Sequence, residues 1–312
     1  MGDRVAVTVG RSPIVVVRAE GGLRAFHNIC RHRGMVVADG APSCGESLRC
    51  PYHGWEWDLD GQLVRVPQRR TQFPDLDPET LGLHPASVAE WEGMVFVHAE
   101  CPVAPFAEAR AGLDAHLGSF RPGRLPQVAR VRIEADLNWK LFVENHIDVY
   151  HLWYLHDRSL AAFDHTRFEH EAVGRNWASY EPMRAGVEPG DGDGDGLVPI
   201  RHLAERDRRG IQAHMLFPNT LMAASASYFA TYAVHPIAPG RSFVDLRVRA
   251  EPDVDVERLV ASIRAFIDED VRACEQIQRA LPAARFGVGP LARTHERPIE
   301  TFQTNLLEAL EA

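Results

Sequence analysis

Two short segments of the sequence each pair one cysteine with one histidine. Cys30-x-His32 lies within "CRHRG", and Cys50-x-x-His53 lies within "CPYHGW". Two thiolates and two imidazoles in such pairs can hold a tetrahedral zinc ion, or a [2Fe-2S] cluster in which two histidines replace two cysteines on one iron. The spacing alone is compatible with both, so the choice depends on how the two residue types are distributed.

The distribution of these four side chains favours the iron–sulfur cluster. Structural zinc fingers usually pair Cys with Cys and His with His, whereas each segment here supplies one of each, which suits two irons with unlike ligands. The pattern C-x-H-x17-C-x-x-H is typical of a Rieske cluster, an electron carrier whose histidine edge can be exposed. Cys44 has no histidine two or three residues after it, and we expect a free buried thiol there.

A second group of polar residues lies further along the chain, in "NWKLFVENHIDVYHLWYLH". This segment is predicted to be helical from Asn138 and contains Asp148, His151 and His156, a set of side chains that indicates metal binding. At ~100° per residue, Asp148 and His151 share a face of a straight helix, but His151 and His156 lie about 140° apart. If both histidines bind one metal, the helix must therefore end or bulge between them.

The third ligand of such a site is expected to be a carboxylate. Two histidines and one carboxylate form the facial triad of non-haem Fe(II) oxygenases, which leaves positions open for oxygen. The helix predicted from about Val256 to Leu281 provides Asp270 at the centre of its apolar stripe, whereas Asp268 and Glu269 are predicted to point elsewhere. An unpaired carboxylate is costly to bury. A salt bridge to a buried arginine is the alternative for Asp270, and metal ligation is preferred because the two histidines need such a partner.

The elements that must position these residues fall into two groups. From Arg4 to Val97, short alternating or β-branched runs separated by "EGG", "DG" and Pro-containing turns predict a small all-β domain. A short helix at 107–117 and a strand at 129–135 follow, and then long helices and strands that do not alternate as parallel βαβ units would. We therefore expect an α+β chain with an antiparallel sheet in its second domain, divided into residues 1–105 and 106–312.

The composition restricts the classes of function. The 34 basic and 43 acidic side chains give a formal net charge of −9, and the scattered acids argue against nucleic acid as a partner. No apolar run of about 18 residues and no basic leader is present, so we expect neither membrane spanning nor secretion. Five cysteines do not complete a disulfide framework, which favours a cytoplasmic location.

One acidic run resembles a calcium loop. "GDGDGDG" at 190–196 has the expected alternation, but its twelfth position is His202 instead of glutamate. We therefore predict a surface loop rather than a calcium site.

At these residues the chain resembles the large (alpha) subunits of Rieske-type aromatic ring-hydroxylating oxygenases, over nearly its whole length. Beyond the two metal motifs, the similarity includes "LHPASVAEWEGMVFVH", "EDVRACEQIQRAL" and the terminal "HERPIETF". The resemblance implies a Rieske [2Fe-2S] domain followed by a helix-grip catalytic domain, in which an antiparallel sheet curves around a long helix. Family members have several tens of residues before the strand that corresponds to "RVAVTV", so the first domain is expected to be short at its N-terminus.

The resemblance also implies roles for the residues singled out above. Asp148 matches the family's bridging acid, which hydrogen-bonds the iron ligand corresponding to His151 and reaches the cluster histidine, here His53, of a neighbouring subunit. Such a bridge implies a ring of protomers, commonly a homotrimer, with or without a separate small subunit. The cluster ligands look like Cys30, His32, Cys50 and His53, and the ligands of the mononuclear Fe(II) look like His151, His156 and Asp270.

The implied activity is that of an oxygenase. A separate reductase, directly or through a ferredoxin, would supply NAD(P)H-derived electrons to the cluster and on to the mononuclear iron, where O2 is activated beside the substrate. We expect a small aromatic or hydrophobic substrate that is mono- or dihydroxylated or oxidatively demethylated. A quaternary ammonium substrate, bound in an aromatic cage of Trp153 and Tyr154, is the alternative. The alternative class of function is a protein that transfers electrons or binds a ligand and has no oxygenase activity.

The candidate residues of the substrate pocket are predicted to face the iron from the long helix and the sheet. They are Phe142, Asn145, His146, Val149, Leu152, Trp153, Phe163, Phe217, Leu221 and Tyr228.

Overall fold

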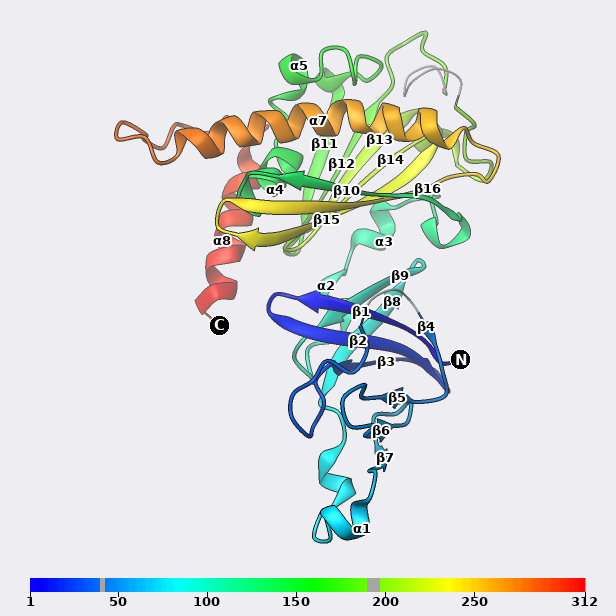
Figure 1. The fold of residues 1–312 in the computed structure, drawn as a ribbon. Coiled ribbons are helices and arrows are strands. Elements are labelled where there is room, and N and C mark those ends of the chain that lie inside the picture. Colours follow the sequence, from blue (N-terminus) through cyan, green and yellow to red (C-terminus); the bar gives the residue numbers. More distant parts are fainter. Residues whose placement is uncertain (40–42, 190–196, 312) are drawn as a thin grey trace. The chain divides into compact units, whose positions relative to one another are not determined.

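The computed structural model describes residues 1–39, 43–189 and 197–311, which form two compact units (Figure 1). The first unit is Met1–Phe106, and the second begins at Ala107. Strands dominate the first unit, and the second combines strands with long helices, which confirms the predicted α+β class. The acidic run at 190–196 lies outside the described residues. Within the described ranges, no helix has both the length and the apolar character that crossing a bilayer requires.

The first unit contains a six-stranded sheet in the order β4-β1-β2-β3-β8-β9. Its strand β2 (Ser12–Ala19) is central, and its consecutive side chains point to opposite faces. Val15 and Val17 join one apolar cluster, and Ile14 and Val16 join another, so β2 is buried on both faces. The other strands of this sheet are β1 (Asp3–Val9), β3 (Gly22–His27), β4 (Ser43–Cys44), β8 (Pro85–Trp91) and β9 (Met94–His98).

A second, three-stranded sheet of this unit holds the loop with the second cysteine–histidine pair. It consists of β5 (Leu48–Arg49), β6 (Glu56–Trp57) and β7 (Leu63–Arg65). The indole of Trp57 is fully buried and donates a hydrogen bond to the Leu81 carbonyl at 3.0 Å. In the β6–β7 turn, Gly61 has φ 82°, and a Cβ there would lie 2.5 Å from the Phe26 ring, so the turn requires glycine. The ligand loop is therefore anchored on packed strands.

The prediction that Cys44 is a buried thiol is wrong. Cys44 is exposed in β4, a two-residue strand at the edge of the six-stranded sheet. Its Sγ lies 3.5 Å from the Met1 carbonyl oxygen. Cysteines are usually buried, but an edge strand this short has only one neighbouring strand to cover it.

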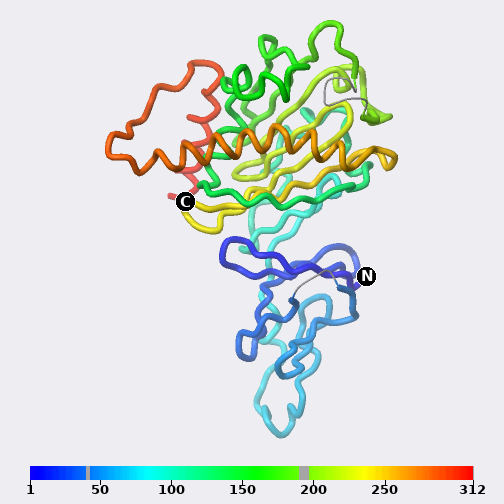
Figure 2. The backbone as a smooth tube through the Cα atoms, turned by 45° about the horizontal axis from the view of Figure 1, so that its top comes forward, coloured from blue at the N-terminus to red at the C-terminus, as the bar shows by residue number. Residues whose placement is uncertain are grey.

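The second unit contains a seven-stranded antiparallel sheet in the order β10-β16-β15-β14-β13-β12-β11. Figure 1 and Figure 2 both show the long helix α7 (Val256–Ala280) running across these strands. The helices α4 (Trp139–Ile147), α7 and α8 (Arg297–Glu311) share one apolar core with the sheet. The strands are β10 (Gln127–Ala135), β11 (Glu169–Val173), β12 (Asn176–Pro182), β13 (Gly210–Leu216), β14 (Thr220–Ser225), β15 (Tyr228–Ala238) and β16 (Arg241–Arg249).

Helix α7 matches its predicted range closely because both its start and its apolar stripe are encoded locally. The Asp255 side chain caps it by accepting a hydrogen bond from the Arg258 backbone N–H at 3.1 Å. Its buried residues recur every three or four positions, as a helix that packs along one face requires. They are Leu259, Ile263, Ile267, Val271 and Cys274.

The helix that begins after Asn138 ends earlier than predicted. Asn138 caps α4 through a hydrogen bond from the Lys140 N–H, but α4 ends at Ile147 and Asp148 is extended. The Asp148 carboxylate accepts a hydrogen bond from the Tyr150 N–H at 2.6 Å, which competes with continuation of the helix. A four-residue helix, α5 (Leu152–Leu155), then connects the two histidines. The predicted helix end between His151 and His156 is present, because α5 ends at Leu155, and a further break lies before His151, where α4 ends.

Two further elements differ from the expectation. The helix predicted at 107–117 is split into α2 (Phe106–Ala109) and α3 (Leu113–His116), because Gly112 adopts φ 86° between them. The strands β11 and β12 were not predicted, since their sequence "EHEAVGRNWASYEP" mixes polar residues into both faces. Strand β12 pairs with β13 and β11 pairs with β12, so the two strands extend the sheet to its outer edge.

Candidate metal centres

The structure brings the four side chains of the first metal motif together. The ring centroids of His32 and His53 are 4.7 Å apart, and the thiols of Cys30 and Cys50 lie within hydrogen-bonding reach of each other. Both cysteines are buried, whereas His53 is exposed and His32 is half-buried. The two thiols are therefore shielded, and the imidazole side of the group faces solvent within this unit.

The two ligand loops are closed in the same way. The Gly34 N–H donates to the Cys30 carbonyl at 2.9 Å, and the Gly54 N–H donates to the Cys50 carbonyl at 3.1 Å. Both glycines have positive φ, 76° and 71°, which few other residues adopt without strain. The matched loops direct each cysteine and its histidine toward a shared centre.

The surroundings fit an iron–sulfur cluster. The Nδ1 atom of His32 is buried and has no hydrogen-bond partner among the described residues, so it is available to a metal. The ring of Trp55 stacks on His32 at 4.9 Å and Phe73 packs against its edge at 5.7 Å. Two thiols, two imidazoles and an apolar wall are the donor set and environment of a [2Fe-2S] cluster with unlike ligands.

The structure also brings together the three residues of the second candidate site. The Nε2 atom of His156 lies 2.9 Å from Asp270 Oδ1, and the Nε2 atom of His151 lies 3.5 Å from the same oxygen. One ligand atom from each of the three residues falls within 4.8 Å of the others. The histidines come from the two ends of α5 and the carboxylate from the middle of α7, so the site depends on how these helices pack.

Asn145 was predicted to line the substrate pocket, and the structure places it against two of the three candidate ligands, His151 and Asp270. Its Nδ2 donates to Asp270 Oδ1 at 3.0 Å and lies 3.2 Å from His151 Nε2. Its Oδ1 accepts a hydrogen bond from the Cys274 thiol at 3.2 Å, and burial raises the pKa of that thiol, which keeps it protonated. Asn145 is thus oriented with its N–H2 group toward the centre of the site.

Each histidine of the site is also held through its second nitrogen. His151 Nδ1 lies 3.2 Å from Asp148 Oδ2, and His156 Nδ1 lies 2.8 Å from Glu269 Oε2. The Ser159 hydroxyl donates to the same Glu269 oxygen at 2.6 Å. The prediction that Glu269 points away from the site is wrong, because one residue along α7 turns a side chain by only ~100°. Such carboxylate–imidazole contacts fix the orientation of metal-binding histidines.

The charge of this group suits a divalent cation. Burial would lower the pKa of His156, but its hydrogen bonds to Asp270 and Glu269 raise it above the usual value. Three carboxylates surround two imidazoles here: Asp148, Glu269 and Asp270. Two imidazole nitrogens and one carboxylate oxygen on one side of a shared centre form the ligand set of non-haem Fe(II) sites.

Replacing Glu269 with glutamine is expected to weaken iron retention by roughly 10- to 100-fold, the usual effect of losing a partner of a metal-binding histidine. The amide keeps the size of the side chain but loses the charge that orients His156. Iron content after dialysis against a chelator series measures the effect. Asp268→Asn is the matched control, since Asp268 pairs with Arg264 on the helix surface. Equal iron retention in both variants would exclude a positioning role for Glu269.

The other predicted pocket residues lie in several environments. Trp153 is half-buried with its ring 5.0 Å from His295, and Tyr154 is 88% exposed, so these two do not form a closed cage. Phe217 is half-buried beside Phe302. Six of them are buried in the interior of the second unit: Phe142, Val149, Leu152, Phe163, Leu221 and Tyr228. Whether they contact a substrate stays a prediction.

His146 contacts two aromatic residues, Trp177 and Tyr232, that the sequence did not single out. Its ring lies 6.4 Å from Trp177 and 6.1 Å from Tyr232, and its Nε2 donates to the His214 carbonyl at 3.1 Å. Loss of solvation lowers the pKa of His146 to about 4, so the imidazole is neutral at pH 7. The Trp177 Nε1 and the Tyr232 hydroxyl are buried without a partner among the described residues. Only the pairing of β12 with β13 could have revealed Trp177, and β12 was not predicted.

Two family models match the chain. The Rieske [2Fe-2S] domain model matches residues 1–85, and the model for the catalytic domain of ring hydroxylating alpha subunits matches residues 122–312. The chain belongs to the ring-hydroxylating alpha-subunit family. The predicted cofactors of this alpha subunit, a [2Fe-2S] cluster and a mononuclear iron, are confirmed by the two matches.

Curated relatives match most of this alpha subunit. Choline monooxygenase of Beta vulgaris is 28% identical over 94% of this chain, which spans 65% of that protein, less than two thirds of its length. The glycine betaine monooxygenase oxygenase subunit of Chromohalobacter salexigens is 27% identical over 96% of this chain and 76% of its own.

Solved structures share the fold. The quaternary ammonium Rieske monooxygenase CntA matches with a TM-score of 0.83 at 21% identity, covering 98% of this chain and 84% of its own. Naphthalene 1,2-dioxygenase from Rhodococcus sp. matches with a TM-score of 0.77 at 21% identity, covering 99% and 86%. At these identities the likeness describes the fold alone.

Proposed function

We propose that this chain is the oxygenase component of a Rieske monooxygenase that acts on a small quaternary ammonium compound. The observation that carries the oxygenase assignment is the convergence of His151 Nε2 and His156 Nε2 on Asp270 Oδ1. We assign these three residues as the Fe(II) ligands, and the four cluster ligands are Cys30, His32, Cys50 and His53. The proposed domains are residues 1–105 and 106–312. An electron carrier or ligand-binding protein without a mononuclear iron would not require three metal ligands at this position.

Two observations support the substrate class. The curated relatives are named for choline and glycine betaine, and each of them matches more than nine tenths of this chain. In this chain the neutral imidazole of His146 lies against the indole of Trp177 and the phenol of Tyr232. His146 directly follows Asn145, which contacts the proposed iron ligands. Aromatic faces attract a cation that cannot be hydrated strongly, such as a methylated ammonium group. We therefore prefer the quaternary ammonium substrate to the aromatic one.

The residues of the proposed site have distinct tasks. A mononuclear Fe(II) bound there would supply the activation of O2, and the cluster would supply electrons one at a time. Asp148 and Glu269 hold the two imidazoles through their Nδ1 atoms, which keeps both Nε2 atoms directed at Asp270. Asn145 offers an N–H2 group to the same centre. The aromatic residues exclude water and orient the methylated group of the substrate.

The proposed partners follow from this assignment. The electrons would come from NAD(P)H through a separate reductase, directly or through a ferredoxin. Asp148 would join the His151 imidazole to His53 of a second copy, and we propose a ring of protomers, commonly a trimer. The solved structure of a quaternary ammonium Rieske monooxygenase is described in terms of inter-subunit electron transfer, which supports this arrangement.

The substrate class is tested with choline, glycine betaine and 3,3-dimethylbutan-1-ol, which replaces the choline nitrogen with carbon. We expect kcat/KM for at least one quaternary compound to exceed that of the neutral isostere by about tenfold or more, the size of a desolvated cation–π interaction. Oxygen consumption coupled to product is measured with a surrogate reductase and NAD(P)H. Coupled turnover of neutral aromatic compounds with none for the ammonium compounds would overturn the proposal.

A further inference from the structure

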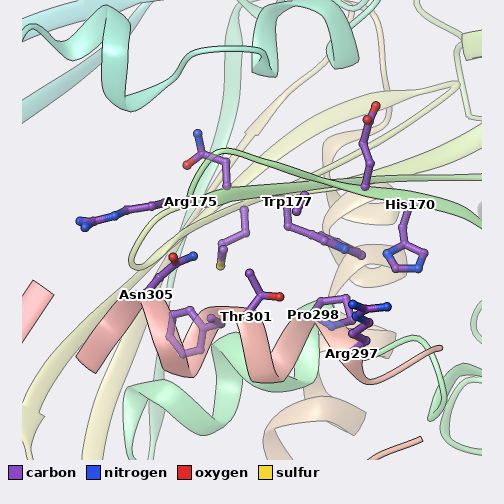
Figure 3. Close-up of a pocket in the computed structure, with 12 residues that line it drawn as sticks. His170, Arg175, Trp177, Arg297, Pro298, Thr301 and Asn305 are labelled. Carbon is purple, nitrogen blue, oxygen red and sulfur yellow. The ribbon is translucent and has the colours of Figure 1, made fainter. Parts of the chain in front are cut away.

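A cavity of about 360 Å³ lies between α8 and the strands β11 and β12 (Figure 3). None of the ten predicted pocket residues lines it. Its apolar surface comes from Trp177, Met215, Pro298 and Phe302, all of them buried. Trp177 also contacts the His146 ring at 6.4 Å, so it is a wall shared by this cavity and the proposed substrate site. The cavity is therefore adjacent to the site where we place the ammonium group.

The cationic group at this cavity that lacks a carboxylate partner is Arg297. Figure 3 shows Trp177 reaching toward His170 and Arg297, whereas Arg175 points away at the opposite end. Arg175 pairs with Glu308 at 3.7 Å, but no carboxylate within the described ranges forms an ion pair with Arg297. Arg297 is exposed at the first residue of α8.

The acid that lines the cavity does not neutralise this arginine. Along β11, side chains alternate between the two faces of the sheet, and Ala172 is the residue paired with Trp177. Glu171 therefore projects to the opposite face, where its carboxylate lies 3.0 Å from His116 Nε2. The imidazole of His170 adds no charge of its own to the cavity, because burial, together with His295 and Arg297, lowers its pKa. Among the residues that line the cavity, Arg297 is thus the charged side chain at this end.

An unpaired N–H donor adds to this preference. The Trp177 Nε1 atom is buried without a partner among the described residues, in a side chain that is only 3% exposed. The Asn305 Nδ2 atom is likewise buried and unpartnered within that part of the chain, but it lies further along α8, on the Arg175 side of the cavity (Figure 3). Buried donors without partners are costly, so a ligand that accepts hydrogen bonds would stabilise the cavity.

We propose that Arg297 binds the carboxylate of a zwitterionic substrate, a short molecule with a methylated ammonium group at one end and a carboxylate at the other. The carboxylate takes the Arg297 guanidinium, whose planar donors match a carboxylate. The ammonium group lies on the Trp177 ring, directed toward His146 and the metal site. This inference rests on the proposed function and deepens it, since it favours a betaine over choline, which ends in a neutral hydroxyl.

The test compares equilibrium binding of glycine betaine and choline to the full chain by calorimetry, without a reductase. We expect Arg297→Gln to raise the Kd of glycine betaine by roughly tenfold or more, as the loss of a charge-assisted hydrogen bond does, and to leave the Kd of choline within about twofold. Arg293→Gln is the matched control, an exposed arginine four residues earlier that does not line the cavity. It is expected to leave both Kd values within about twofold.

The outcomes separate this inference from the proposed function. Equal affinity of the unaltered protein for both compounds, or an unchanged Kd of glycine betaine in Arg297→Gln, would overturn the carboxylate site while coupled turnover of ammonium compounds stands. Absence of coupled turnover with either compound in the unaltered protein would overturn the proposed function itself. A rise of both Kd values in Arg297→Gln by the same factor would indicate lost packing, and would also overturn the carboxylate site.

Discussion

Asp270→Ala is expected to lose about one of three irons per chain, two in the cluster and one mononuclear, and to lower oxygen-coupled turnover by roughly 1,000-fold or more. The Asp270 carboxylate is the point on which both Nε2 atoms converge, and it is the anionic member of the set. Without it, two imidazoles remain as ligands, and these bind a divalent ion far less well. Iron and acid-labile sulfide, counted on the same sample, separate the two metal centres.

The control for this prediction lies on the same helix. Asp268→Ala removes a carboxylate two residues earlier that pairs with Arg264 on the surface of α7, and it is expected to keep three irons and full turnover. The cluster should be retained in both variants, because its candidate ligands all belong to the first unit. If Asp270→Ala kept three irons per chain, the assignment of this residue as a ligand would be wrong.

Asp148→Asn, compared with the unaltered protein at equal iron and sulfide contents, is expected to lower turnover by about 100-fold. With His151 Nε2 bound to Fe(II), the proton of the imidazole would be on Nδ1, which would donate to Asp148 Oδ2, 3.2 Å away. In asparagine, one oxygen can still accept from the Tyr150 N–H, but an N–H2 group then faces the Nδ1 proton. The hydrogen bond proposed to connect the iron site with the cluster of a second copy is therefore lost.

The readout for Asp148→Asn must separate electron transfer from metal binding. The cluster, reduced chemically under anaerobic conditions, should be reoxidised by O2 in the presence of substrate more slowly in the variant than in the unaltered protein. Asp157→Asn is the matched control, an exposed acid one residue after His156. Unaltered turnover in Asp148→Asn would rule out the proposed route between copies.

The two metal sites differ in how far the sequence predicts them. Cys30, His32, Cys50 and His53 are recognisable because each pair lies within one loop, and a glycine at positive φ closes each loop locally. His151 and Asp270 belong to elements 119 residues apart, yet the unusual position of a carboxylate in an apolar stripe pointed to the pairing. Local chemistry was sufficient where the cost of burying a charge singles out one residue.

Other features were beyond reach because they depend on packing between distant segments. Glu269 looked like a surface residue, and only the approach of α7 to the end of α5 brings it to 2.8 Å from His156 Nδ1. The early end of α4 has a local cause, the hydrogen bond from the Tyr150 N–H to the Asp148 carboxylate. The helical periodicity of the sequence does not show this hydrogen bond. Periodicity predicts where a helix is favourable, and it does not report which side chain interrupts it.

The sequence by itself determined the ligand types, the α+β class and the range of α7, because these follow from residue chemistry and from repeats of three or four positions. The tertiary structure alone decided that Trp177 of β12 meets His146 of α4, and that Arg297 lies beside that indole without a carboxylate partner among the described residues. The reason is physical: strand order and helix packing are set by burying apolar area over the whole unit, which no short window of sequence records.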